Sequence, residues 1–213
     1  MDKDYNAILS ERETENITVV MAVHDQADQL EKNLPLFLDV AGEAGAQVIV
    51  VDDMSVDDTP DVLKRMRAEH QNLYTTFLPQ SVIINPSRLR LALSVGVKAA
   101  KGRYVVFADI NRPPVSGEWL TGLADGEAAV VYSNRKKDAV THVVASELED
   151  LRSLVMKTER KGGRGHRGRW MKQRRGVYDA LAVKRERAFD AVNYFDQRVR
   201  GWKLAGLRLS TWL

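Results

Sequence analysis

VIVVDDMSVDDT, residues 48–59, contains one complete unit of the fold. Its first four residues are apolar and β-branched, which is typical of a strand buried on both faces of a parallel sheet. An acidic turn follows, Thr59 is a favourable helix N-cap, and Pro60 suits the first helical position. The stretch therefore predicts a strand, a polar loop and a helix that runs to about Glu69.

The same unit occurs on both sides of this stretch. Residues 17–23 (ITVVMAV) predict a buried strand, and residues 26–41 predict an amphipathic helix. Further on, residues 74–78 predict a less regular strand, 88–100 a helix and 104–108 (YVVFA) another buried strand. Alternating strands and helices imply a parallel sheet with right-handed crossovers. We therefore predict an α/β, Rossmann-like fold in which a mostly parallel sheet is flanked by helices within a single domain.

The later part of the chain has weaker patterns. Residues 128–132 and 177–183 predict two further strands, and 146–157 and 184–190 predict two further helices. Between them, residues 161–176 are rich in Gly and Arg and predict a loop.

Polar residues follow three of the predicted strands. His24 and Asp25 follow the first strand, Asp52 and Asp53 the second, and residues 109–111 (DIN) the strand that ends at Ala108. Ligands of parallel α/β proteins bind outside the carboxyl ends of the strands. The three polar groups are therefore expected to converge on one binding crevice.

Composition narrows the possible functions. The 213 residues include no cysteine, which excludes thiol catalysis, thiolate zinc sites and disulfides. Residues 1–16 are polar and acidic, unlike a signal peptide, and no apolar run reaches the length of a membrane span. These features predict a cytoplasmic protein. The strings G-x-G-x-x-G and G-x-x-x-x-G-K-[ST] are absent, which removes the usual support for dinucleotide or P-loop binding.

Positive charge is concentrated in one segment. Residues 157–175 hold nine basic residues and one acidic residue, a charge of +8 that leaves −5 for the rest of a chain of net charge +3. This pattern favours an anionic partner that binds at this segment over a nucleic acid that binds across the whole protein surface. The alternative is a solvated, mobile loop. The candidate anion-binding residues are Arg167, Arg169, Arg174 and Arg175.

These motifs resemble glycosyltransferase family 2, whose members have the nucleotide-sugar-binding GT-A fold. Residues 50–59 (VVDDMSVDDT) follow the family's V-D-D-x-S-x-D-x-T signature, and 99–109 (AAKGRYVVFAD) follow its A-x-G-x-Y-hydrophobic-D approach to the metal motif. Residues 17–25 resemble its opening strand. The resemblance covers residues 17–135, with a weaker match over 176–195.

The resemblance implies a nucleotide-binding set. Asp53 would accept the imide hydrogen bond of uracil, Val23 and His24 would flank the base, and Asp109 would lie near the ribose and diphosphate. Asp52 belongs to the same set. Two alternatives stay open: Asp52 and Asp53 serve only the turn and the following helix, and His24 is solvated or internally bonded.

The metal motif and the catalytic motif depart from the family. The usual Asp-x-Asp, which binds Mg²⁺ or Mn²⁺, is here Asp109-Ile110-Asn111, so the resemblance implies weaker metal binding or none. Asp109 alternatively caps a turn before the two prolines at 113–114. The acidic pair that contains the catalytic base of inverting members is missing, and Asp190 and Asp196 are the nearby substitutes.

Taken as a family member, the chain has a polar extension (1–16), a nucleotide-sugar-binding half (17–135) and an acceptor-side half (136–213) with a basic loop at 157–176. The implied activity is inverting transfer of a hexose from a UDP-sugar to a lipid-phosphate or saccharide acceptor. The implied setting is cell-envelope polysaccharide synthesis, with the basic loop on the inner face of an anionic membrane. The alternatives are a catalytically degenerate binding or scaffold module, and another parallel α/β protein.

Overall fold

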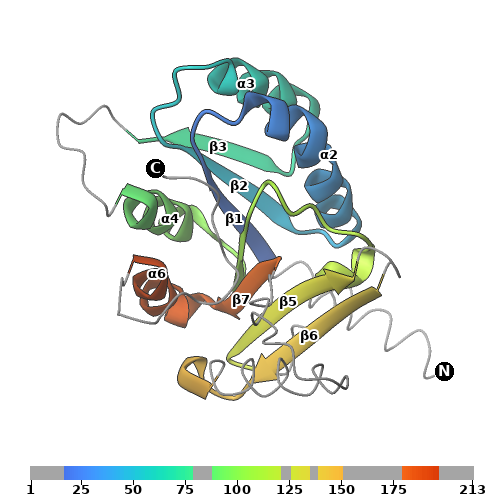
Figure 1. The fold of residues 1–213 in the computed structure, drawn as a ribbon, viewed down its shortest axis with the longest axis vertical. Helices are drawn as coiled ribbons and strands as arrows, with labels where there is room; N and C mark the ends of the chain where they lie inside the picture. Colours follow the sequence, from blue (N-terminus) through green and yellow to red (C-terminus); the bar gives the residue numbers. More distant parts are fainter. Residues whose placement is uncertain (1–16, 79–87, 121–125, 135–138, 151–178, 197–213) are drawn as a thin grey trace, which may run out of the picture.

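A seven-stranded mixed sheet forms the centre of the molecule (Figure 1). The structure, a computed structural model, describes residues 17–78, 88–120, 126–134, 139–150 and 179–196. The strand order is β3-β2-β1-β4-β7-β5-β6. The strands are β1 (Ile17–Val23), β2 (Gln47–Asp52), β3 (Leu73–Phe77), β4 (Tyr104–Ala108), β5 (Ala128–Asn134), β6 (Ala139–Ala145) and β7 (Ala180–Lys184).

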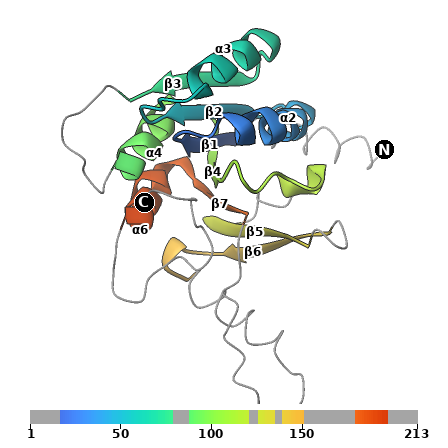
Figure 2. The ribbon, with the colours of Figure 1, turned by 45° about the horizontal axis from the view of Figure 1, so that its top comes forward.

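The first four strands are parallel, and the last three add antiparallel pairs. β1 pairs with β2 and β4, and β2 pairs with β3, all in parallel. β7 runs antiparallel between β4 and β5, and β6 pairs antiparallel with β5. Figure 2 shows β5 and β6 continuing the sheet beyond β7. Both halves expected from the sequence therefore contribute strands to one sheet.

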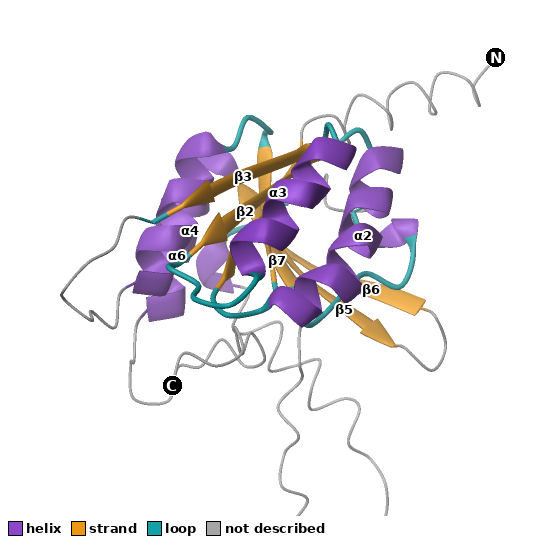
Figure 3. Cartoon of the chain, turned by 90° about the horizontal axis from the view of Figure 1, so that it is seen from above, coloured by secondary structure: helices purple, strands orange, loops and turns teal. Residues whose placement is uncertain are grey.

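Helices cover both faces of the sheet. They are α2 (Ala27–Glu43), α3 (Thr59–Glu69), α4 (Arg88–Ala99) and α6 (Ala188–Asp196), with short 3-10 turns at Gly117–Trp119, Leu148–Asp150 and Arg185–Arg187. α2 and α3 pack on one face, and α4 and α6 pack on the other (Figures 1 and 3). No helix in the described part of the chain is long and apolar enough to cross a membrane.

Side-chain alternation assigns each strand residue to one face. In β2, Val48 and Val50 pack under α2 and α3, whereas Ile49 and Val51 pack under α4. α4 lies so close to β1 that a Cβ atom added at Gly96 would collide with the Val20 side chain. Glycine at this position allows the close approach that fixes α4 on the sheet.

The α/β fold predicted from the sequence is confirmed, while several element predictions need correction. β6 was not expected. The helix predicted over 146–157 is a 3-10 turn at Leu148–Asp150, and residues 151–157 lie outside the described part. The last described helix continues to Asp196 because Ala188, Ala191 and Val192 provide a buried face against α4.

Candidate functional site

The carboxyl ends of β1, β2 and β4 lie at one edge of the sheet. In the register, Val23 is opposite Asp52, and Val20 is opposite Phe107. The residues that follow these strands therefore lie side by side. We call His24, Asp53 and Asp109 the polar edge.

Two loops above this edge are joined by hydrogen bonds. The Asp25 N–H donates to Ser55 Oγ (2.9 Å), and the Val56 N–H donates to Asp25 Oδ1 (2.7 Å). Asp25 and Met54 have left-handed backbone conformations, with φ of 50° and 60°. Such conformations are uncommon outside glycine, and here cross-loop bonds hold them. The loops after β1 and β2 therefore act as one unit.

Asp57 joins the same unit to the helix ends. The Ala27 N–H, at the start of α2, donates to Asp57 Oδ2 (3.0 Å), and the Thr59 N–H donates to Asp57 Oδ1 (3.0 Å). Desolvation alone would raise the pKa of Asp57, but the bonds from Thr59 and Ala27 bring it below the usual value. Thr59 is the first residue of α3 and not its N-cap, because its Oγ1 accepts the Gln26 N–H instead.

Asp52 shapes the turn after β2. It is 7% exposed, and its Oδ1 accepts the Ser55 N–H (3.1 Å) and the Ser55 hydroxyl (2.5 Å). This is the local turn role that the sequence left open for an aspartate here.

Asp53 has a different environment. It is fully buried, and its Oδ1 accepts two N–H bonds from Arg88, one from Nε at 2.8 Å and one from Nη2. Its Oδ2 is buried and has no hydrogen-bond partner among the described residues. Leaving a buried acceptor unpaired costs about 1–3 kcal/mol. Asp53 thus has one oxygen that lacks a donor.

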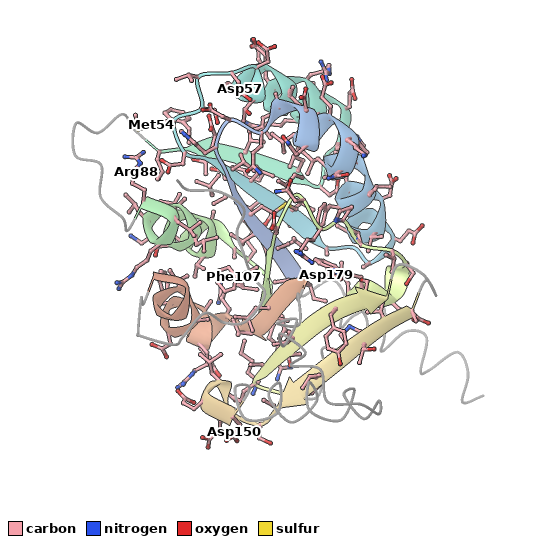
Figure 4. The ribbon with its side chains drawn as sticks, viewed as in Figure 1. Met54, Asp57, Arg88, Phe107, Asp150 and Asp179 are labelled. Carbon is pink, nitrogen blue, oxygen red and sulfur yellow. The ribbon has the colours of Figure 1, made fainter. Side chains whose placement is uncertain are left out.

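Arg88 was not identified from the sequence. It is the first residue of α4, and its side chain is 13% exposed. A cation at a helix N-terminus is unfavourable for the helix dipole, which is the signal that could have identified it. The buried Asp53 carboxylate accounts for its position (Figure 4).

His24 and Val23 lie on opposite faces of the sheet. The His24 ring lies with Nδ1 2.6 Å from the Asp53 carbonyl oxygen, and a carbonyl only accepts, so Nδ1 carries the proton. Its Nε2 is 3.5 Å from Asp25 Oδ2. The Val23 side chain is fully buried in the core under α2 and α3. Alternation therefore keeps the Val23 side chain away from the polar edge, contrary to the base-flanking role expected for it.

Asp109 closes a tight turn. It is 4% exposed, and its Oδ1 accepts the Asn111 N–H (2.9 Å) and the Asn111 side-chain amide (3.0 Å). Because a carboxylate only accepts, the Asn111 nitrogen must face Asp109. Among the described residues, no group of three or more His, Asp or Glu side chains is arranged to hold a metal ion. One carboxylate and an amide turned toward it are a poor donor set for Mg²⁺ or Mn²⁺.

A second buried carboxylate lies near this turn. Asp179 directly precedes β7, whose Ala180 pairs with Ala108 at the end of β4. It is 2% exposed, and its Oδ1 is 3.5 Å from Arg112 Nη1. Its Oδ2 has no hydrogen-bond partner within the described ranges. Neither residue was predicted from the sequence, because the two are 67 positions apart.

Of the candidate catalytic and acceptor residues, only Asp190 has a side chain in the described part of the structure, and it lies away from the polar edge. Asp190 lies in the first turn of α6, is 56% exposed, and has Oδ2 3.5 Å from Arg187 Nε. α6 begins just after β7 ends beside Tyr104, which is the opposite edge of the sheet. Asp196 ends α6, but its side chain lies outside the described part, as do Arg167, Arg169, Arg174 and Arg175.

Comparisons with known proteins agree with this architecture. The model of the family described as Glycosyl transferase family 2 matches residues 18–110. A search of curated proteins finds no significant match. The mannosyltransferase PcManGT from Pyrobaculum calidifontis, solved with GDP-Man and Mn²⁺, is 19% identical with a TM-score of 0.53, over 80% of this chain and 45% of that one.

Two bacterial structures are more distant. M. tuberculosis glucosyl-3-phosphoglycerate synthase is 17% identical with a TM-score of 0.48, over 85% of this chain and 61% of that one. S. aureus TarS 1-349 in complex with UDP-GlcNAc is 15% identical with a TM-score of 0.42, over 83% of this chain and 47% of that one. The chain thus spans less than two thirds of these proteins. The family match and the fold together confirm the resemblance: residues 18–110 carry the glycosyltransferase family 2 pattern on a GT-A-like α/β fold.

Proposed function

We propose that this chain binds a nucleotide-diphosphate sugar at the polar edge and serves the transfer of that sugar to an acceptor. The observation that carries the proposal is Asp53 Oδ2, a buried acceptor without a partner at the carboxyl edge of the sheet. Ligands of parallel α/β proteins bind at this edge, and a ligand N–H would remove the cost of the unpaired oxygen.

The Asp53 geometry favours uracil over guanine. Arg88 already occupies Oδ1, so a single oxygen is left for the base. Uracil offers one ring N–H between two carbonyls, and Arg88 has further N–H donors for a carbonyl. Guanine presents two adjacent donors, which a carboxylate binds best with both oxygens. Cytosine has no proton at its ring N3 and would have to donate from its exocyclic amine instead.

The rest of the donor would extend along the sheet edge. β2, β1, β4 and β7 are neighbours, so about 14 Å separate the end of β2 from the start of β7 at the usual strand spacing. A base at Asp53 would place the ribose over His24 and Asp109. The diphosphate and sugar would then lie toward Arg112 and Asp179, where a guanidinium can neutralise phosphate charge. Figure 4 shows Arg88 beside the start of α4 and Asp179 beside β7.

The proposed reaction is inverting transfer. The acceptor hydroxyl oxygen forms the new bond to the sugar anomeric carbon while the bond to the diphosphate oxygen breaks, and the nucleoside diphosphate leaves. A carboxylate takes the hydroxyl proton. Asp196 is the candidate base, whereas the position of Asp190 at the opposite edge argues against a role for it. The described residues do not fit a divalent cation, and we derive no step through one.

The acceptor side of the proposal rests on sequence alone. Arg167, Arg169, Arg174 and Arg175 would hold a lipid-phosphate acceptor or rest on an anionic membrane surface, as in cell-envelope polysaccharide synthesis. These residues lie outside the described structure. A protein that keeps nucleotide binding without turnover is the second candidate, and the Asn111 amide turned toward Asp109 favours it.

A ligand panel tests the proposal. Thermal unfolding is followed with UDP, GDP, CDP and dTDP, each with and without Mn²⁺. A ligand at 100 times its dissociation constant should stabilise the protein by about 2.7 kcal/mol. UDP and dTDP, whose bases share the imide N–H, should give larger effects than GDP and CDP. Equal stabilisation by all four compounds, or by none, would contradict base recognition at Asp53. Hydrolysis and transfer assays with UDP-sugars then separate an enzyme from a binding module.

A further inference from the structure

A basic groove lies at the sheet edge opposite the polar edge. It encloses about 680 Å³, and five basic side chains and one acidic side chain line it. β4 starts at this edge and β7 ends there, because the two strands are antiparallel. The topology thereby brings together cations from two separate stretches of the chain, 98–103 and 184–185. The basic residues are Lys98, Lys101, Arg103, Lys184 and Arg185.

Four of these five cations have no carboxylate partner among the residues that the structure describes. Lys184 Nζ is 2.7 Å from Glu127 Oε1 and is neutralised. Within the described part of the chain, no acid lies within the 4.0 Å of an ion pair from Lys98, Lys101, Arg103 or Arg185. Arg103 stacks on the Tyr104 ring at 5.8 Å, and Arg185 Nη1 donates to the Ala100 carbonyl at 3.4 Å. Like charges held together without counter-charges repel one another, and an anion would relieve that repulsion.

Some arginines outside the groove are paired with acids. Arg65, Arg88, Arg112 and Arg187 all lie within ion-pair distance of an acid. Lys32, Lys64 and Arg67 have no such partner among the described residues, so what sets the groove apart is that four unpaired cations line one hollow.

The groove also has an apolar side. Its floor contains Val97 and Ala100, which are 3% and 4% exposed, and Phe189 at its rim is 45% exposed. An exposed aromatic ring beside unpaired cations suits a ligand that joins an anionic group to an apolar or planar group. The hollow shape favours a discrete group over a flat charged surface.

We propose that this groove is a second binding site, which takes a phosphate-bearing ligand. β4 is five residues long, so about 13 Å of strand separates the groove from the polar edge. The two sites can therefore be occupied together. The phosphate can belong to a soluble phosphate compound or to a lipid headgroup.

Paired triple variants test the proposal. Lys101→Gln, Arg103→Gln and Arg185→Gln remove three groove cations, and Lys32→Gln, Lys64→Gln and Arg67→Gln remove three exposed cations from α2 and α3. Both variants change the net charge equally and leave residues 157–176 intact. Binding is measured by calorimetry with inorganic pyrophosphate, in the presence of saturating UDP. It is also measured by sedimentation with phosphatidylcholine vesicles, with and without phosphatidic acid.

Each basic residue near a phosphate surface contributes roughly fivefold in affinity, so the groove variant should bind on the order of a hundredfold more weakly. The control variant should keep most of the wild-type affinity. Loss confined to pyrophosphate identifies a soluble ligand, and loss confined to phosphatidic acid vesicles identifies a lipid headgroup. Equal behaviour of the two variants with both probes overturns the proposal. Lys98→Gln with Lys101→Gln removes two groove cations, and at the same fivefold for each residue it should lose about 25-fold in affinity.

Discussion

Replacing Arg88 by Ala should destabilise the protein far more than replacing a surface arginine. The substitution leaves the Asp53 carboxylate, which is fully buried, without its counter-charge. Removing one partner of a buried ion pair costs about 3–5 kcal/mol. At about 2–4 °C per kcal/mol for a chain of this size, the melting temperature should fall by roughly 6–20 °C.

Arg65→Ala is the matched control. Arg65 also contacts a carboxylate, with Nη2 2.6 Å from Glu31 Oε1, but the two side chains are 55% and 51% exposed. Exposed pairs contribute about 0.2–1 kcal/mol. Both variants are compared by urea unfolding and by thermal melts, with circular dichroism before unfolding to check the fold.

The Arg88 variant also tests the site. If Asp53 receives the base of UDP, saturating UDP should stabilise the wild-type protein more than the Arg88→Ala variant, because the free carboxylate is no longer held in place. Arg88→Lys keeps the charge but loses the two-donor geometry of the guanidinium. The stability of this variant should therefore lie between that of the wild-type protein and that of Arg88→Ala. Equal, small losses for Arg88→Ala and Arg65→Ala would refute the argument that the Arg88–Asp53 pair is a buried element of the site.

Four further outcomes follow from the structure and the sequence. Asp53→Asn turns the ligand-facing acceptor into a donor and should lower UDP affinity about tenfold to a hundredfold in calorimetry; unchanged affinity would remove Asp53 from the site. Asn111→Asp replaces the donor that faces Asp109 by a second carboxylate, and a divalent cation would relieve the repulsion between the two. In titrations this variant should bind Mn²⁺ more tightly than the wild-type protein, whereas Asn111→Ala should not. The folded pKa of Asp57 is lowered from 3.8, so its contribution to stability is complete above the unfolded pKa and is lost as the pH falls through the folded pKa. In acid unfolding, the stability of Asp57→Asn should therefore fall less steeply below about pH 4 than that of the wild-type protein. A quadruple Gln variant of the basic segment should bind anionic vesicles more weakly, by about 1 kcal/mol per residue, with UDP affinity nearly unchanged. Loss of UDP binding with intact vesicle binding would show instead that the segment holds the diphosphate. The four positions are Arg167, Arg169, Arg174 and Arg175.

Much of the parallel sheet could be predicted because its strands are buried on both faces. Strands such as 17–23 and 104–108 are continuous apolar runs with polar residues after them. β6 was not predicted from the sequence. It pairs with β5 alone at the end of the strand order, and most of its residues are partly or fully exposed, so it lacks the apolar run of a buried strand. Its sequence, AVTHVVA, has no clean alternation, so tertiary pairing and not local pattern makes it a strand.

The site was predicted only where its residues follow strands. His24, Asp53 and Asp109 could be named because strand ends of a parallel sheet meet at one edge. Arg88 and Asp179 could not, because each acts through a partner far away in the sequence, 35 positions for Asp53 and 67 for Arg112. Such contacts depend on where α4 and β7 dock, which no local pattern specifies.

Asp52 and Asp53 show why neighbouring identical residues can have different surroundings. Side chains alternate along β2, so Asp52 continues the face of Val50, while Asp53 continues the face of Val51, which α4 covers. Asp52 therefore meets Ser55 within its own loop, and Asp53 meets Arg88 of α4. Replacing Asp52 should change UDP binding only through the shape of the turn, whereas replacing Asp53 removes the acceptor itself. A shift of one residue in the β2 register would exchange the two environments, so the apolar run that sets the register also selects which carboxylate lies beside Arg88.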